Sequence, residues 1–307
     1  MKRFIKNIIV FIIFGLLIGE FIARWFALSS DIPNRTIDRY GIQKYIPNQH
    51  GTWKGGTHTW HINEKGWPGY LPKSNDNLIT IIGDSFIENF MNPEECHQSV
   101  YLGKILPKYN YFEASRSGIS FIEAMEISKQ LDTLGPRFQV IHLHDSDLEE
   151  SIMQLKKHND ITQLDVNKQK IIFGKMNSPG LKKILYNWKF MYYLYRRFPI
   201  WINKPNKTQN SKITLKNNKE GFNFKYYKKL LEYIVANYNI DDKILVFRPE
   251  STSELVKFAK DFGFKTIQLK TDINDHWSFE HDSHWTCYGH EKVAEQVAEY
   301  LKSLIPD

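Results

Sequence analysis

The nine residues from Leu78 to Phe86, LITIIGDSF, carry the strongest structural signal of the chain. An unbroken apolar run that ends in turn residues is typical of a parallel strand buried on both faces of its sheet. Ser85 stands where this strand ends. Ligands of open α/β sheets bind outside the carboxyl ends of the strands, so we expect Ser85 at the active edge.

A second short motif, near the C-terminus, complements this serine. Asp282-Ser283-His284-Trp285 supplies a histidine and a carboxylate two residues apart. A serine hydroxyl is a weak nucleophile until an adjacent imidazole, itself oriented by a carboxylate, activates it. The sequence therefore predicts a catalytic triad of Ser85, His284 and Asp282.

Each member of this triad also has a simpler interpretation. Ser85 is a favourable N-cap for a helix that follows the strand. The alternative role of His284 is that of a structural histidine. Separately, Asp272 and Asp275 are alternatives to Asp282 as the carboxylate that orients the imidazole.

Strands and helices alternate along the rest of the chain. Further strands are predicted at residues 109–113, 138–142, 243–247 and 265–269, and helices at 99–108, 121–131, 253–262 and 288–304. This alternation indicates the α/β class: a three-layer α/β/α sandwich around a mostly parallel five-stranded sheet.

The N-terminus has the composition of a membrane segment. Lys2, Arg3 and Lys6 precede an uncharged apolar run over residues 7–19, which extends to Leu28. Basic residues ahead of a span favour a cytoplasmic N-terminus. We therefore predict a single-pass anchor in the cell (inner) membrane, with residues 7–28 in the bilayer and the remaining chain exported to the periplasm.

Two alternatives to an anchor remain open at this stage. Ala27-Leu28-Ser29 is a passable cleavage site for a signal peptide, although Glu20 and Arg24 are placed awkwardly just before it. The other alternative is a buried helix of a cytosolic protein.

Three regions follow from these patterns. Residues 1–28 form the tail and anchor, residues 29–75 an extended strap interrupted by prolines and glycines, and residues 76–307 the α/β domain. A basic, aromatic insertion interrupts that domain at about 160–220. Its centre, residues 181–202, is either a lid helix or a helix lying on lipid, and residues 203–218 form a flexible loop.

The net charge of +7 and the pI of about 9.1 raise the question of nucleic-acid binding. The sequence has none of the usual nucleic-acid-binding motifs, so an anionic membrane surface or an acidic polysaccharide is the better partner. Cys96 and Cys287 have no metal-ligand spacing. We interpret them as two separate buried thiols, with a disulfide as the alternative, and we predict neither metal nor cofactor.

Taken together, Gly83-Asp84-Ser85-Phe86, Asp282-Ser283-His284-Trp285 and Gly289-His290 resemble the motifs of the SGNH hydrolases, also called the GDSL family. The resemblance covers most of residues 76–304. The stretch from His61 to Trp67 also looks like the lead-in of membrane-anchored members. The resemblance implies an α/β hydrolase fold and serine acyl chemistry on an ester.

The family's oxyanion hole combines the backbone N–H of the nucleophile, a glycine N–H and an asparagine side chain. The resemblance assigns the first two to Ser85 and Gly118. Where the family has Gly-x-Asn-Asp, this chain has His144-Asp145-Ser146-Asp147, so Ser146 occupies the place of the asparagine. A hydroxyl is shorter than an amide, and losing one donor costs roughly 10²–10³ in rate.

We therefore expect an esterase or O-acyltransferase acting on O-acyl groups, most plausibly O-acetyl, of an envelope or exported polysaccharide. His144 and Trp285 are candidate substrate contacts, and Trp60, Trp67 and Trp277 are candidate stacking surfaces. The altered oxyanion hole motivates one alternative, a non-catalytic scaffold of an envelope assembly system. The basic aromatic insertion motivates another, a lipase or thioesterase acting on membrane lipids.

Overall fold

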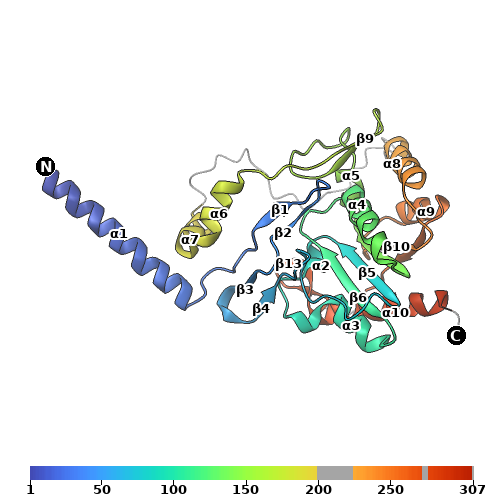
Figure 1. Ribbon diagram of the computed structural model, residues 1–307, viewed down its shortest axis with the longest axis horizontal. Coiled ribbons are helices and arrows are strands. Elements are labelled where there is room, and N and C mark those ends of the chain that lie inside the picture. The colour runs from blue at the N-terminus through green and yellow to red at the C-terminus, as the bar shows by residue number, and fades with distance from the viewer. Residues whose placement is uncertain (199–223, 272–275, 306–307) are drawn as a thin grey trace.

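Five parallel strands form the central sheet of the computed structural model, which describes residues 1–198, 224–271 and 276–305 (Figure 1). The strands are β5 (Leu78–Gly83), β6 (Asn110–Ser115), β7 (Phe138–Leu143), β10 (Lys243–Phe247) and β11 (Lys265–Gln268). Their order across the sheet is β11-β10-β7-β5-β6, and every pairing is parallel. The predicted α/β class and the five-stranded parallel sheet are confirmed.

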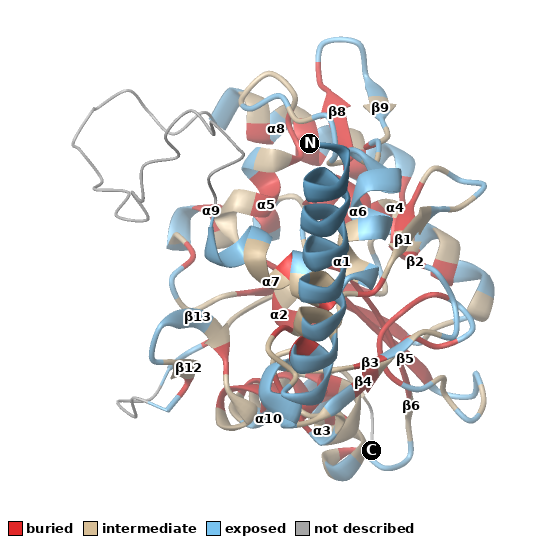
Figure 2. Cartoon of the chain, turned by 90° about the vertical axis from the view of Figure 1, so that its left-hand side faces the viewer, coloured by how far each residue is buried: buried red, intermediate tan, exposed pale blue. Residues whose placement is uncertain are grey.

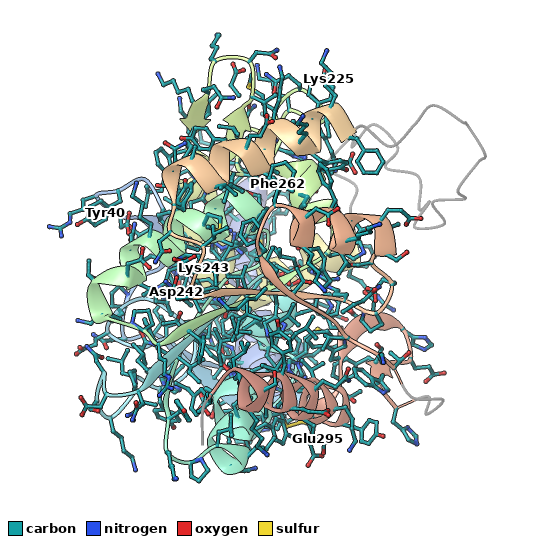
Figure 3. The ribbon with its side chains drawn as sticks, turned by 90° about the vertical axis from the view of Figure 1, so that its right-hand side faces the viewer. Tyr40, Lys225, Asp242, Lys243, Phe262 and Glu295 are labelled. Carbon is teal, nitrogen blue, oxygen red and sulfur yellow. A yellow bond between two sulfur atoms is a disulfide. The ribbon has the colours of Figure 1, made fainter. Side chains whose placement is uncertain are left out.

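Helices cover both faces of this sheet because its strands bury alternate side chains on opposite sides. In β5, Leu78 and Ile82 face one apolar core and Ile79 and Ile81 face the other. The first core contains α4 (Phe121–Leu131), α8 (Phe224–Asn237) and α9 (Ser253–Asp261); the second contains α3 (Gln98–Ile105) and α10 (Cys287–Leu304). Figure 3, which labels Lys225 on α8, Lys243 on β10 and Glu295 on α10, shows the sheet between these two layers.

The region predicted to be an extended strap is more ordered than expected. Two antiparallel hairpins occupy it: β1 (Arg35–Ile37) with β2 (Gln43–Tyr45), and β3 (His50–Thr52) with β4 (Thr59–His61). Tyr45, Trp60 and Ile62 form a small apolar cluster of their own. Arg116 Nε donates to the Gln43 carbonyl over 3.0 Å, which ties the first hairpin to the sheet edge.

The four tryptophans considered as stacking surfaces are buried. Trp60, Trp67, Trp277 and Trp285 expose between 4% and 6% of their surface. Burial of large aromatic rings contributes to the core, and it leaves these four rings without a free face for a ligand. The prediction that they contact substrate is wrong.

The described part of the insertion contains one hairpin and two short helices. The hairpin joins β8 (Gln163–Asp165) to β9 (Lys170–Ile172), and the helices are α6 (Pro179–Asn187) and α7 (Lys189–Arg197). The loop predicted at 203–218 lies outside the described residues.

The N-terminal apolar run forms α1 (Lys2–Trp25), which is long and apolar enough to cross a membrane. Only Ala23 of this helix is buried. Figure 1 shows α1 extending away from the domain, and Figure 2 shows it exposed along its length. A buried helix of a cytosolic protein is thereby excluded, and α1 is either a signal sequence or an anchor.

Cys96 and Cys287 are joined in a disulfide, so their interpretation as two separate thiols is wrong. The pairing brings the short helix η2 (Glu94–Cys96) against the start of α10. The sequence does not predict this disulfide, because the contact between the two cysteines depends on how α3 and α10 pack side by side.

Candidate active site

Ser85 is the first residue of the short helix α2 (Ser85–Glu88), directly after β5. Asp84, not Ser85, caps this helix: its Oδ1 accepts a hydrogen bond of 3.0 Å from the Phe86 N–H. The other Asp84 oxygen accepts a 2.6 Å bond from the Arg248 guanidinium. The N-cap interpretation of Ser85 is therefore wrong, and its hydroxyl is free for other contacts.

His284 and Asp282 reach Ser85 from the hairpin of β12 (Ser278–Phe279) and β13 (Asp282–Trp285). His284 Nε2 lies 2.7 Å from Ser85 Oγ, and His284 Nδ1 contacts Asp282 Oδ1. The structure thus brings together the three residues of the predicted triad. Asp272 and Asp275 lie outside the described residues.

The Asp282 carboxylate is suited to hold the imidazole in one tautomer. Partial burial raises its pKa, but hydrogen bonds from the backbone and imidazole of His284 outweigh that effect and bring the pKa below its usual value. An ionised carboxylate accepts a hydrogen bond from Nδ1–H, which leaves Nε2 as the acceptor for the Ser85 hydroxyl.

Phe86 supports the imidazole from behind. Its ring stacks on His284 with 4.5 Å between centroids, and Trp285 packs edge-on against Phe86 at 5.0 Å. Trp285 is therefore part of the wall that positions His284, and the prediction that it contacts substrate is wrong.

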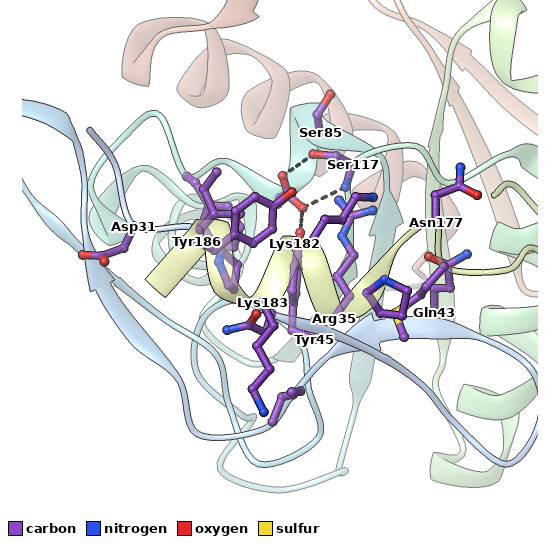
Figure 4. Close-up of a pocket in the computed structure, with 18 of the residues that line it drawn as sticks. Asp31, Arg35, Gln43, Tyr45, Ser85, Ser117, Asn177, Lys182, Lys183 and Tyr186 are labelled. Carbon is purple, nitrogen blue, oxygen red and sulfur yellow. Dashed lines mark hydrogen bonds between the residues drawn. The ribbon is translucent and has the colours of Figure 1, made fainter. Parts of the chain in front are cut away.

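Ser85 and His284 line a cavity of about 590 Å³ (Figure 4). The first hairpin and the residues before it form one wall, and α6 forms another through Lys182, Lys183 and Tyr186. A cavity of this size takes a drug-sized ligand. Three cationic side chains line it, those of Arg35, Lys182 and Lys183.

The floor of this cavity is a hydrogen-bonded cluster that the sequence did not reveal. The Glu88 carboxylate accepts from the Ser117 N–H over 2.8 Å, from the Ser117 hydroxyl and from the Tyr45 hydroxyl (Figure 4). Burial and the nearby Glu88 charge raise the pKa of Tyr45 well above its usual value. Glu88 lies three residues after Ser85, on the same helical face, and that spacing is the signal that would have found it.

The predicted oxyanion donors are only partly assembled. As the first residue of α2, Ser85 has a backbone N–H without an intrahelical partner. Gly118 has φ +79°, a conformation that favours glycine, and adjoins the cavity-lining Ser117. Ser146 is not among the residues lining the cavity, because its hydroxyl is held 2.8 Å from His144 Nδ1.

His144 has a structural contact of its own. Its Nδ1 accepts from the Ser146 N–H over 3.2 Å, which caps α5 (Asp145–Glu150). Burial and the positive charge of Arg248 lower its pKa, so the imidazole is neutral at physiological pH. His144 does not line the cavity either, so no described feature supports the prediction that it contacts substrate.

Comparison with known proteins gives similarities of fold only. No protein-family model and no curated protein sequence matches the chain. Among solved structures, a member of the lipolytic protein G-D-S-L family from Veillonella parvula covers 73% of this chain and 98% of its own, at 10% identity and a TM-score of 0.37.

TesA covers 74% of this chain and 99% of its own at 11% identity and a TM-score of 0.38. A family two carbohydrate esterase from Clostridium thermocellum covers 81% of this chain and 68% of its own, at 12% identity and a TM-score of 0.36. Over about three quarters of its length, the chain is thus similar to solved structures that include G-D-S-L lipolytic proteins.

Proposed function

We propose that the protein is a serine esterase or O-acyltransferase of the SGNH type. Its substrate is an O-acyl group, most plausibly O-acetyl, of an envelope or exported polysaccharide. The observation that carries this proposal is the 2.7 Å contact between Ser85 Oγ and His284 Nε2, inside a cavity and with Asp282 on the far side of the imidazole.

In the proposed reaction, Ser85 Oγ attacks the ester carbonyl carbon while His284 Nε2 takes the hydroxyl proton. Asp282 stabilises the imidazolium, and the N–H groups of Ser85 and Gly118 donate to the oxyanion. Collapse of the tetrahedral intermediate expels the alcohol, which takes the proton from Nε2. Water or a sugar hydroxyl then attacks the acyl carbon while His284 Nε2 takes its proton. Collapse of the second tetrahedral intermediate breaks the bond to Ser85 Oγ, which takes the proton back from Nε2 as the acid or the new ester leaves.

We further propose that α1 is an uncleaved anchor. The Glu20 carboxylate accepts from the backbone N–H groups of Lys189 and Phe190 over 3.2 and 2.8 Å, and Arg24 donates to the Asn187 carbonyl over 2.7 Å. Cleavage after residue 28 would remove all three contacts. The Cys96–Cys287 disulfide favours an oxidising compartment for the domain.

The polysaccharide substrate rests on the proposed compartment, where envelope glycans occur, and not on the charge of the cavity. Three cationic side chains, those of Arg35, Lys182 and Lys183, line the cavity together with three acidic ones, those of Asp31, Glu88 and Asp160. The buried tryptophans give no support to aromatic stacking on sugar rings.

The first experiment measures acetate release from p-nitrophenyl acetate by the wild type, Ser85→Ala and the control Ser303→Ala, whose serine is exposed on α10. We expect Ser85→Ala to lose at least about 10³-fold in rate, with Ser303→Ala unchanged. A fluorophosphonate should label the wild type and the control but not Ser85→Ala.

Two results would favour the alternatives. Equal rates for the wild type and Ser85→Ala, together with no fluorophosphonate labelling of the wild type, would favour a non-catalytic scaffold. Activity that peaks with long acyl chains would contradict O-acetyl groups and favour a lipase or thioesterase.

A further inference from the structure

An exposed apolar stripe runs along α6 and α7. Its members recur at spacings of three and four residues, and each exposes between 40% and 66% of its surface: Leu181, Ile184, Trp188, Met191, Tyr195 and Phe198. This spacing puts the side chains on one side of each helix. Single exposed apolar residues are ordinary, but a continuous stripe marks a surface that binds a partner or a membrane.

Cationic residues accompany the stripe at both ends. Lys182 and Lys183 lie on α6, and Arg196 and Arg197 end α7; all four are exposed. Neither helix contains an acidic residue. Apolar residues bordered by Lys and Arg are typical of helices that lie in the interface of an anionic bilayer.

The two helices are held beside the C-terminal end of α1 by direct contacts with it. Glu20 caps the start of α7, and Arg24 pairs with Glu20 and bonds the end of α6. Phe190 packs so closely on Gly19 that a Cβ there would lie 2.6 Å from its ring. These charged residues near the end of the apolar span mark the level where hydrocarbon gives way to headgroups.

Figures 1 and 2 agree with this placement, since α6 and α7 lie beside α1 on the side of the domain from which it extends. A bilayer that holds α1 would therefore lie on the side of the domain that carries both helices.

We propose that α6 and α7 lie in the headgroup region of an anionic bilayer and hold the mouth of the Ser85 cavity at its surface. Lys182, Lys183 and Tyr186 of α6 also line that cavity, so one helix contacts both the lipid and the substrate site. Substrate would then enter from the plane of the membrane surface. This placement rests on the proposed role of α1 as an anchor, but it goes beyond the proposed chemistry and does not depend on it.

The test uses the full chain in lipid nanodiscs, with an environment-sensitive nitrobenzoxadiazole fluorophore on a single introduced cysteine. Both native cysteines are in the disulfide, so the new thiol is the one that reacts. The label is placed by Ile184→Cys or Met191→Cys in the stripe, and by Glu295→Cys as a control on the far layer (Figure 3). One set of discs contains phosphatidylcholine alone, and the other also contains phosphatidylglycerol.

With phosphatidylglycerol present, we expect blue-shifted emission and quenching by brominated acyl chains at 184 and 191, and neither at 295. The double variant Arg196→Glu, Arg197→Glu should lose this immersion. Its matched control, Lys257→Glu, Lys260→Glu on α9, changes the net charge equally and should retain immersion. Near-ultraviolet circular dichroism identifies any variant that fails to fold.

Water-like emission at both stripe positions in both lipids would overturn the proposal. So would protection that appears only in native membranes, because that result would assign the stripe to a protein partner. In the Ser85→Ala background, the labels at 184 and 191 should give the same emission and quenching as in the wild-type background. Failure of the catalytic proposal would therefore not alter the result.

Discussion

Ser85 owes its position to Asp84, whose two carboxylate oxygens serve different neighbours. One oxygen caps α2 and the other binds Arg248, which comes from the end of β10. The Arg248 guanidinium also lies 3.5 Å from the centre of the Phe86 ring, and Phe86 supports His284. A single arginine therefore connects the nucleophile turn with the histidine of the candidate triad.

Of the three assigned oxyanion residues, Gly118 and Ser146 should respond differently to mutation. Ser146→Ala should change the rate of ester hydrolysis far less than the roughly 10²–10³-fold that loss of an oxyanion donor costs, because its hydroxyl is directed at His144. Gly118→Ala should cost much more, since alanine is strained at φ +79°. The measurement is kcat and KM on p-nitrophenyl acetate. A large loss of kcat in Ser146→Ala would show that the hydroxyl turns toward the oxyanion during the reaction.

His142 should make stability depend on pH. It is buried in β7, neither ring nitrogen has a hydrogen-bond partner in the described part of the chain, and burial with the nearby Arg248 charge lowers its pKa to about 3. The unfolded chain binds this proton at about pH 6.5, so stability present above pH 6.5 is lost as the pH falls toward 3. At pH 5 this group alone should cost roughly 2 kcal/mol relative to pH 7.

Urea unfolding of the wild type and His142→Leu at several pH values isolates this effect, because other titrating groups are common to both proteins. We expect the difference in unfolding free energy between them to change between pH 7 and pH 5. A difference independent of pH would show that His142 has the same pKa in the folded and unfolded chain, which would contradict the lowered pKa.

The residues that the sequence predicted well are those whose roles depend on local motifs. Ser85 follows its strand, and Asp282 and His284 lie on one short hairpin, so a few neighbouring residues define each of them. Ser146 was predicted to be an oxyanion donor from its place in a motif, but the orientation of its hydroxyl depends on the N-cap of α5. Tyr45 and Ser117 meet Glu88 only after separate segments pack together, and such contacts leave no local pattern.

At the level of elements, strand and helix boundaries were predictable where apolar patterns were long. Predicted and observed bounds coincide for α4 and β10, and differ by one or two residues for β6, β7 and α10. The hairpins of residues 35–61 were missed because their strands have only three residues each and lie among prolines and glycines. Their pairing is set by contacts with the sheet edge and not by periodicity.

The disulfide should stabilise the hairpin that carries His284. Cys287 starts α10 two residues after β13 ends, and Asn92, close to Cys96 in the chain, donates a 2.9 Å bond to the Trp285 carbonyl. Replacing both cysteines with serine should lower the unfolding free energy by about 2–5 kcal/mol. Activity should fall further than folding alone explains, since His284 loses a support.

This expectation is checked by measuring thermal unfolding and kcat of the double serine variant and of the wild type, under reducing and oxidising conditions. Reductant should lower the stability and kcat of the wild type and should leave the variant unchanged. Equal stability of the two proteins would contradict a structural role for the disulfide.

At the scale of the whole molecule, α1 and the cavity belong to one connected structure. The chain runs from α1 through the two hairpins to the nucleophile turn, and returns to α1 through α6 and α7. Sequence analysis predicted both the apolar span and the basic aromatic insertion, but not their contact, because it joins residues more than a hundred and sixty positions apart.

Glu20 should be the residue on which this connection depends. Its carboxylate accepts from the N–H groups of Lys189 and Phe190, where the first turn of α7 otherwise lacks partners. Loss of such a cap costs about 0.5–2 kcal/mol, so Glu20→Ala should speed local amide exchange in a peptide covering residues 188–192 by roughly 2- to 30-fold. Glu20→Gln retains an acceptor oxygen and should restore much of the protection. Hydrogen exchange followed by mass spectrometry in nanodiscs measures both variants, with a peptide from α10 as the internal control. Unchanged exchange in Glu20→Ala would mean that α7 is held by its other contacts, which include Phe190 packed on Gly19 and the ion pair of Lys189 with Asp31.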